Sequence, residues 1–382
     1  MEPGPPETAP PSSSGGAPRP GAVRRFLGRV LAASPLAALL ALTGVARLDL
    51  SPPASLAAVV MVLPWLWGGL AGAWLLAALL RRRARPLVLG LATAACAAGL
   101  YGPALVPARD PNGGTAVTLA TWNVHRLGWY ARPAVREAAL VDALDCVAAV
   151  VGSSGVDLLV LQEVDRLRLR ALGERLGFTC EFADYYATGR DDAGGVAACA
   201  RPPWTLSPGR SLPLAHPWHY LFTEARADDV TLNVLAVHLT PWDIGAEDVG
   251  GAATALARGR TRALAALAHE AEVTARAQGL ALDRLVQALV RLRDPTVVAG
   301  DFNAPPDAAI HAALRGHLAD AWARAGAGPG STRRVGGFFP LRVDYVYLTR
   351  PPLGVLDARV PDVACSDHRP VVAVLALPRG AP

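Results

Sequence analysis

A run of 25 residues from Leu56 to Leu80 contains no charged side chain. A helix of about 20 apolar residues is enough to cross the hydrocarbon core of a bilayer, which is about 30 Å thick. The run from Pro86 to Val106 is also long enough, and the run from Val30 to Ala46 is marginal. We therefore expect three transmembrane helices within residues 26–107, and helices buried in a soluble protein are the alternative.

Arginines lie on one side of these apolar runs. Four of them precede the first run and four more lie in the turn from Arg81 to Arg85, whereas the first connection carries only Arg47 beside Asp49. The positive-inside rule therefore places the N-terminus and the arginine turn in the cytoplasm. Three crossings leave everything after Val106 outside, and a cleaved signal peptide in place of the first run gives the same result. We expect a multi-pass protein of the cell membrane that contacts the lipid bilayer and has an extracytoplasmic C-terminal domain.

The two ends of the chain differ in composition. Residues 1–25 are mostly Pro, Ser and Gly and are expected to be disordered, because they have little to bury. Ten arginines and four acidic residues precede residue 111, which leaves 27 basic and 28 acidic residues of the chain's 37 and 32 for the remainder. A nucleic-acid-binding domain usually has an excess of basic residues, so this balance argues mildly against a nuclease. A local arginine patch would escape this count.

Residues 112–382 alternate short apolar runs with helical stretches, which predicts one α/β or α+β domain with a sizeable core. The expected strands are Ala116–Asn123, Asp157–Gln162, Gly195–Ala200, Thr231–His238, Thr296–Ala299, Val343–Leu348 and Val371–Leu375. The expected helices are Val135–Val151, Arg168–Leu176, Ala252–Gln278, Ala281–Arg291 and Ala308–Leu314.

Polar side chains recur where these strands end or begin. Taken singly, each is an ordinary cap or turn residue. Together they form an oxygen-rich set without cysteine, which favours a hard cation such as Mg²⁺, or Mn²⁺ in its place, over zinc. The set is Asn123, Glu163, His238, Asp301, Asn303, Asp344, Asp367 and His368.

The motifs GDFN, ending at Asn303, and SDHRP, beginning at Ser366, occur in an order that resembles the endonuclease/exonuclease/phosphatase superfamily. The resemblance covers about Val117 to Leu375. It implies two packed β-sheets flanked by helices, with the active site at one edge of the sandwich. It also implies a Mg²⁺-dependent hydrolase that cleaves phosphodiester or phosphomonoester bonds.

The resemblance assigns the metal to three residues. Glu163 looks like the principal carboxylate ligand, Asn123 like the amide of the first motif, and Asp367 like a member of the metal and phosphate network. A cation at this position answers a physical need, because an anionic phosphoester repels the attacking hydroxide.

The remaining residues are assigned to the chemical step. Asp301 is expected to orient or deprotonate the attacking water, and Asn303 and His238 to contact the phosphate. His368 would stabilise the transition state or protonate the leaving group, with Asp344 orienting its ring. The alternative is a catalytically silent membrane scaffold that binds a partner through the same fold.

Several features leave alternatives open. Residues 242–295 form a long connection that would be either a membrane-facing or capping insertion or an ordinary amphipathic surface helix. Tyr185, Tyr186 and Arg190 would either reach the substrate or form a structural turn. Cys180 and Cys199 would be either a disulfide or two buried thiols. The substrate is open between a lipid headgroup and a nucleic acid, and the sequence VACSDHRP differs from the Trp-Cys-Asp-Arg type motif of inositol-phosphatase relatives.

Overall fold

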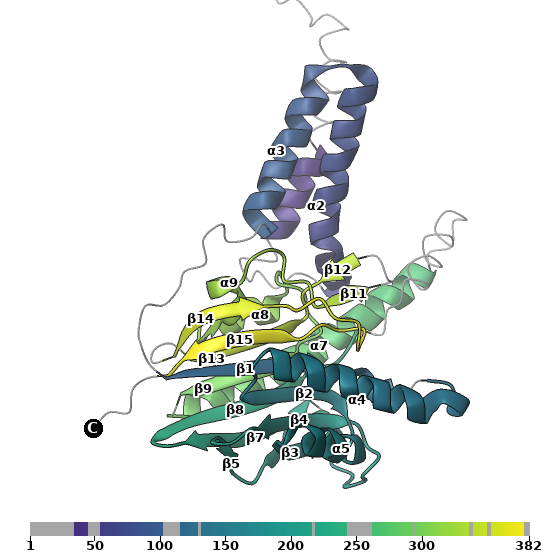
Figure 1. Ribbon diagram of the computed structural model, residues 1–382. Coiled ribbons are helices and arrows are strands. Elements are labelled where there is room, and N and C mark those ends of the chain that lie inside the picture. The colour runs from purple at the N-terminus through teal and green to yellow at the C-terminus, as the bar shows by residue number, and fades with distance from the viewer. Residues whose placement is uncertain are drawn as a thin grey trace, which may run out of the picture.

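The computed structural model places two β-sheets face to face, with helices on both outer faces (Figure 1). It describes residues 34–44, 54–101, 115–128, 131–215, 218–242, 262–293, 295–335, 339–349 and 353–377. The expected disorder of residues 1–25 lies outside these ranges.

The first sheet has the strand order β14-β15-β1-β2-β4-β3. Its central strands β1 and β2 are parallel, and the other pairs are antiparallel. The strands span β1 Ala116–Asn123, β2 Leu158–Val164, β3 Thr179–Asp184, β4 Gly195–Ala200, β14 Gly354–Arg359 and β15 Val371–Ala376.

The second sheet has the order β10-β13-β9-β8-β7-β5, and β6 also pairs with β7. Here β8 and β9 are the parallel pair. The strands span β5 Thr205–Leu206, β6 Arg210–Ala215, β7 Trp218–Ala227, β8 Val230–His238, β9 Thr296–Asp301, β10 Leu318–Asp320 and β13 Asp344–Thr349. A separate hairpin pairs β11 Arg333–Val335 with β12 Phe339–Leu341.

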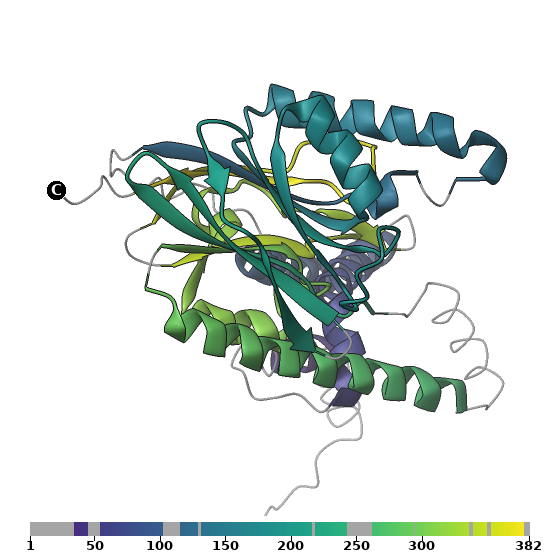
Figure 2. The same cartoon turned by 90° about the horizontal axis from the view of Figure 1, so that it is seen from below.

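Apolar side chains from the facing surfaces of both sheets form the main core, including Leu119, Val160, Val234 and Val346. The opposite face of the first sheet is covered by α4 Arg136–Ser153 and α5 Arg166–Leu176. The outer face of the second sheet is covered by α7 Arg262–Arg291 and α8 Ala309–Arg315. Figure 2 shows the long helices α4 and α7 on opposite sides of the sandwich. The expected two-sheet architecture is confirmed.

The connection that precedes β9 forms the single helix α7, although Gly279 suggested two helices with a break. Leu285 of α7 is fully buried against the second sheet, so packing outweighs the weak helix propensity of one glycine. One face of residues 262–291 therefore packs on the second sheet, and residues 252–261 lie outside the described ranges. The strands without a sequence prediction are β3, β5, β6, β7, β10, β11, β12 and β14.

The N-terminal part contains a helix at residues 34–44, α2 Ala54–Arg81 and α3 Ala84–Tyr101. Trp67 is fully buried between these helices, and its indole nitrogen donates a hydrogen bond to the Thr43 hydroxyl at 2.9 Å. Among the described helices, none combines the length and the apolar character required to cross a membrane. The structure thus gives no support to the expected transmembrane helices.

Two disulfides lie in the sandwich. Cys180 and Cys199 join the neighbouring strands β3 and β4, which decides between the two alternatives for this pair. A second disulfide, between Cys146 and Cys365, joins α4 to the segment before β15 and was not foreseen. Cys365 lies three residues before His368, so this bond bears directly on the site.

Candidate active site

Three of the expected site residues lie in one row across the second sheet. His238 ends β8, Asp301 ends β9 and Asp344 begins β13, and the strand register places Asp301 opposite both of the others. Neighbouring strands therefore bring together residues that are far apart in the sequence. Asn123 ends β1 of the first sheet and reaches the same edge of the sandwich.

Gly300 permits this row to form. A Cβ atom at this position would lie 1.9 Å from the carbonyl oxygen of Val237 on β8. The contact is with backbone, so no side-chain rearrangement could relieve it. The glycine of the GDFN motif therefore allows β9 to approach β8 closely enough to set Asp301 beside His238.

His368 is bound to Asp344 on one side and faces Asp301 on the other. Its Nδ1 lies 2.9 Å from Oδ2 of Asp344, and its Nε2 lies 3.7 Å from Oδ2 of Asp301. Burial alone would lower the pKa of His368, but the two carboxylates outweigh it and raise the pKa to about 9. The imidazole is therefore protonated at neutral pH.

The pKa values of Asp301 and Asp344 are shifted in opposite directions. Burial would raise the pKa of Asp301, but the nearby His368 and His238 lower it below its ordinary value. Burial and the charge of Asp301 raise the pKa of Asp344, although His368 opposes them. Asp301 is therefore the ionised carboxylate at the centre of the cluster.

Asn123 links the two halves of the site. Its side-chain nitrogen donates to Oε1 of Glu163 and to Oδ2 of Asp301, at 3.0 Å in both cases. Glu163 lies at an irregularity in the β2–β4 pairing and has a positive φ of 52°. A non-glycine residue in this conformation is uncommon and marks a strained position. The irregular strand end brings the Glu163 side chain to the amide of Asn123.

Tyr185 connects Glu163 to His238. Its hydroxyl accepts a hydrogen bond from the backbone N–H of Glu163 at 2.8 Å and lies 2.6 Å from Nδ1 of His238. The hydroxyl thus occupies Nδ1 of His238 and leaves Nε2 facing Oδ2 of Asp301 at 3.5 Å. Sequence reasoning preferred a turn residue here. The pattern Asp-Tyr-Tyr after a strand was its only signal.

The other two residues of that alternative lie differently. The Tyr186 side chain is 52% exposed beside Trp218, with ring centroids 6.1 Å apart. Arg190 is paired with Asp192 on the surface. Only Tyr185 belongs to the hydrogen-bonded cluster.

Asn303 is buried and held mainly by backbone. Its N–H donates to Oδ1 of Asp301 at 2.8 Å, and its side-chain amide donates to the carbonyl of Leu239 at 3.0 Å. Gln278 of α7 donates to the carbonyls of Asn303 and Thr240 from behind. One amide hydrogen of Asn303 is thus committed to the protein, and the second is the one that a phosphate oxygen could receive.

Asp367 lies at the margin of this cluster. Its carboxylate is 41% exposed and lies 3.6 Å from both His125 and Arg333. Within the described part of the chain, no hydrogen bond or ion pair joins its side chain to Glu163 or Asn123. Of the eight expected residues, the structure brings seven together and places Asp367 beside them.

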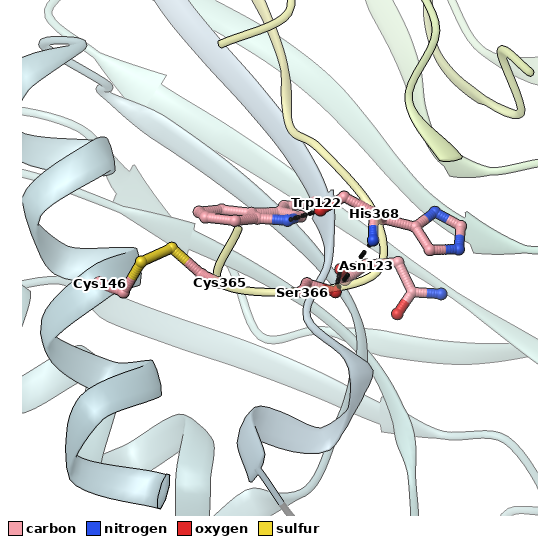
Figure 3. Close-up of a disulfide and its surroundings, with 6 residues drawn as sticks. All are labelled: Trp122, Asn123, Cys146, Cys365, Ser366 and His368. Carbon is pink, nitrogen blue, oxygen red and sulfur yellow. Dashed lines mark hydrogen bonds between the residues drawn. A yellow bond between two sulfur atoms is a disulfide. The ribbon is translucent and has the colours of Figure 1, made fainter. Parts of the chain in front are cut away.

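The segment that carries His368 is fixed at three points (Figure 3). The disulfide ties Cys365 to Cys146 on α4, and the Ser366 hydroxyl donates to the carbonyl of Asn123 at 2.8 Å. The Trp122 indole donates to the carbonyl of His368 at 3.0 Å. These bonds hold the imidazole against the edge of both sheets.

The donor set suits a hard divalent cation. Asp301, Asp344 and His368 have potential ligand atoms within 4.8 Å of one another. His368, however, is protonated and bound to Asp344, and a protonated imidazole has no lone pair for a metal. Glu163 and Asp301, bridged by the amide of Asn123, offer carboxylate oxygens instead, which are the ligands that Mg²⁺ and Mn²⁺ prefer.

The fold and this cluster together define the class of phosphoester hydrolase domains built from two stacked sheets. The chain belongs to the Endonuclease/Exonuclease/phosphatase family, whose sequence profile matches residues 120–368. Members of this family hydrolyse phosphoester bonds. The resemblance drawn from the motifs is thereby confirmed.

Solved structures show the same fold. A family protein from Bacteroides thetaiotaomicron is 16% identical with a TM-score of 0.53, covering 70% of this chain and all of its own. One from Bacteroides vulgatus is 17% identical with a TM-score of 0.53, covering 69% and 100%. A functionally unknown protein from Enterococcus faecalis is 17% identical with a TM-score of 0.52, covering 69% and 100%. No curated protein matches the chain.

Proposed function

We propose that the protein is a metal-dependent phosphoesterase that cleaves phosphodiester bonds by attack of an activated water, with phosphomonoesters as the second possibility. One observation carries this proposal. The ionised Asp301 lies between two histidines, and one of these is held protonated by Asp344. A site that hydrolyses a phosphoester needs such a proton acceptor and such a cationic donor side by side.

Glu163 and Asn123 would hold a Mg²⁺ or Mn²⁺ ion, with Asp301 or Asp367 as a further ligand. Such an ion neutralises phosphate charge and lowers the pKa of a bound water. The half-buried Glu163 carboxylate has its Oε1 bonded to the Asn123 amide, which leaves lone pairs for a cation. This is the role expected for it from the sequence.

The remaining residues have separate roles in the hydrolysis. Asp301 accepts the proton of the attacking water, while protonated His368 binds the phosphate oxygens or supplies a proton to the leaving group. His238 contacts the phosphate through Nε2, because Tyr185 occupies its Nδ1. Asn303 contributes its second amide hydrogen.

A membrane location and a lipid headgroup substrate are part of this proposal. They are supported by the uncharged run Leu56–Leu80 and the arginine distribution. Large apolar side chains are also exposed on α2 and α3, among them Leu79 and Leu80 at 74% and Val88 at 63%. Two disulfides in the catalytic part suit an oxidising, extracytoplasmic compartment.

A substrate panel tests the activity. The purified full chain, with Mg²⁺, with Mn²⁺ and with EDTA, is assayed against bis-p-nitrophenyl phosphate, sphingomyelin, phosphatidylglycerol, RNA and DNA. Metal-dependent hydrolysis that Asp301→Asn abolishes supports the proposal. A chain that binds Mg²⁺ and hydrolyses none of them would favour the silent-scaffold alternative.

Reporter fusions test the location. A reporter that is active only outside the cytoplasm should be active when fused after Pro382 and silent when placed in the Arg81–Arg85 turn. The opposite pattern would overturn the extracytoplasmic placement.

A further inference from the structure

A pocket of about 730 Å³ adjoins the active site but does not contain its buried cluster. It lies between α9 Ala321–Ala325, the hairpin strand β11 and the segment that leads to His368. We call it the arginine pocket, and its principal side chains are Trp322, Arg333, Arg334, Asp362, Asp367 and Arg369. Nothing in the proposed chemistry uses three arginines at this place.

The arginines of this pocket form only weak ion pairs within the protein. Arg369 pairs with Asp362 at 2.6 Å, but the Asp362 side chain is 86% exposed, and Arg333 lies 3.6 Å from Asp367. Ion pairs that reach solvent in this way contribute little free energy and exchange readily. Arg334 is exposed and has no carboxylate partner among the residues that the structure describes. An incoming anion could therefore recruit guanidinium groups of this pocket at low cost.

Backbone pairing connects the arginine pocket to the segment that carries His368. Arg333 forms a bridge with His368 in the backbone pairing, and the N–H of Arg369 donates to the carbonyl of Thr332 at 2.6 Å. A group bound by Arg333 would therefore lie beside the backbone segment that carries His368.

We propose that the arginine pocket binds a second anionic group of the substrate, a phosphomonoester carried on the headgroup next to the scissile phosphodiester. The inference rests on the proposed function and narrows its substrate class. Arginine suits this role because its planar guanidinium binds phosphate oxygens in pairs. Trp322 and Pro340 provide an apolar wall for the carbon skeleton between the two phosphates.

The surroundings favour a small headgroup over a polynucleotide. Three arginines are gathered in one bounded pocket, whereas a nucleic-acid backbone needs cations along a track. The hairpin of β11 and β12 also lies at the end of the sandwich from which α2 and α3 project (Figure 1). The same phosphomonoester could be presented by a lipid or by a soluble molecule, and the experiment separates these sources.

The kinetic test compares two diesters that differ only in the second phosphate. Phosphatidylglycerol phosphate and phosphatidylglycerol are presented in vesicles, and their deacylated forms in solution, to the full chain. Arg334→Gln should raise KM for the doubly phosphorylated substrate about tenfold more than for the singly phosphorylated one, since one charge-assisted contact is lost. Arg226→Gln, an exposed arginine on β7 paired with Glu224, is the matched control and should change neither.

Equal KM effects on both substrates, or a larger effect on a single-stranded oligonucleotide, would overturn the inference. A preference that is kept by the soluble forms assigns the pocket to the phosphate alone, and one seen only with vesicles assigns it to the lipid headgroup.

A binding measurement separates failure of the pocket from failure of the activity. Inorganic phosphate is titrated calorimetrically into the EDTA-treated full chain and into the same two variants. Binding that is lost in Arg334→Gln and kept in Arg226→Gln supports the pocket even if no substrate is turned over. Binding that is indifferent to Arg334 refutes the pocket even if hydrolysis is observed.

Discussion

The imidazole of His368 lies between two buried carboxylates, with Nδ1 2.9 Å from Asp344 and Nε2 3.7 Å from Asp301. The two contacts are different in kind. The shorter one is a hydrogen bond that fixes the ring, and the longer one exceeds hydrogen-bonding distance, so Nε2 is not hydrogen-bonded to Asp301.

Replacing His368 should lower kcat more than replacing Asp344, which orients its ring. General acid–base help is worth about 10²- to 10⁴-fold, so His368→Ala should lower kcat by that factor with a smaller effect on KM. Asp344→Asn should cost less, because the ring remains. The double variant should be little worse than His368→Ala, since Asp344 then has nothing to orient. Steady-state kinetics on all three variants checks this, and a double loss equal to the product of the single losses would contradict the dyad.

Glu163→Gln removes a charge at nearly constant shape and should weaken Mg²⁺ binding by at least about tenfold, because a carboxylate ligand is replaced by an amide. Calorimetric titration with Mg²⁺ measures this. Glu174→Gln on the exposed surface of α5 is the control and should bind as the unaltered chain does. Unchanged metal affinity in Glu163→Gln would show that the ion is held elsewhere.

Removal of either disulfide should lower stability, but only one of them should also affect catalysis. Each typically contributes about 2–4 kcal/mol to the free energy of unfolding, so replacing either pair by serines should lower the Tm. Only the Cys146→Ser, Cys365→Ser double variant should also have a lower kcat when it is assayed at temperatures well below its Tm. The reason is that Cys365 anchors the segment of His368. The Cys180→Ser, Cys199→Ser variant is the matched control. Equal kcat in the two variants would argue against a positioning role.

His311 should make the fold sensitive to acid. It is fully buried, with Nε2 donating to the Ala304 carbonyl and Nδ1 facing the Tyr347 hydroxyl, and burial lowers its pKa to about 3. Above pH 6.5 the residue is neutral in both folded and unfolded chains. Below that pH only the unfolded chain takes up the proton, so the free energy of unfolding should fall by up to about 1.4 kcal/mol per pH unit until pH about 3.

The variant His311→Gln isolates this contribution. It keeps a donor and an acceptor but loses the ring that packs against Tyr345, so it should be less stable than the unaltered chain at pH 7. It does not titrate, so it should lose less stability between pH 6.5 and 4. Urea unfolding midpoints at several pH values measure the difference. Parallel pH profiles for the two chains would assign the acid sensitivity to other groups.

The sequence was informative wherever a residue type and a strand end coincided. Asp301 and His368 are readable because GDFN and SDHRP each combine a turn, a charge and an adjoining apolar strand. Tyr185 was not assigned, because its role depends on a hydroxyl that contacts residues of two other strands, which the local pattern Asp-Tyr-Tyr does not indicate. The partner of Cys365 was equally hidden, since a disulfide between residues 219 positions apart depends on geometry that spacing does not supply.

The strand register of β8 and β9 sets His238 opposite Asp301, while the chain between them leaves the sheet and returns. A change of length in that connection leaves the register intact, whereas one residue added inside either strand would turn its side chains to the other face. Loop closure entropy grows only slowly with length. A grafted sensor or recognition module in this connection would keep the spacing of the reacting groups if it left Gln278 and Leu285 of α7 in their contacts with Asn303 and the second sheet.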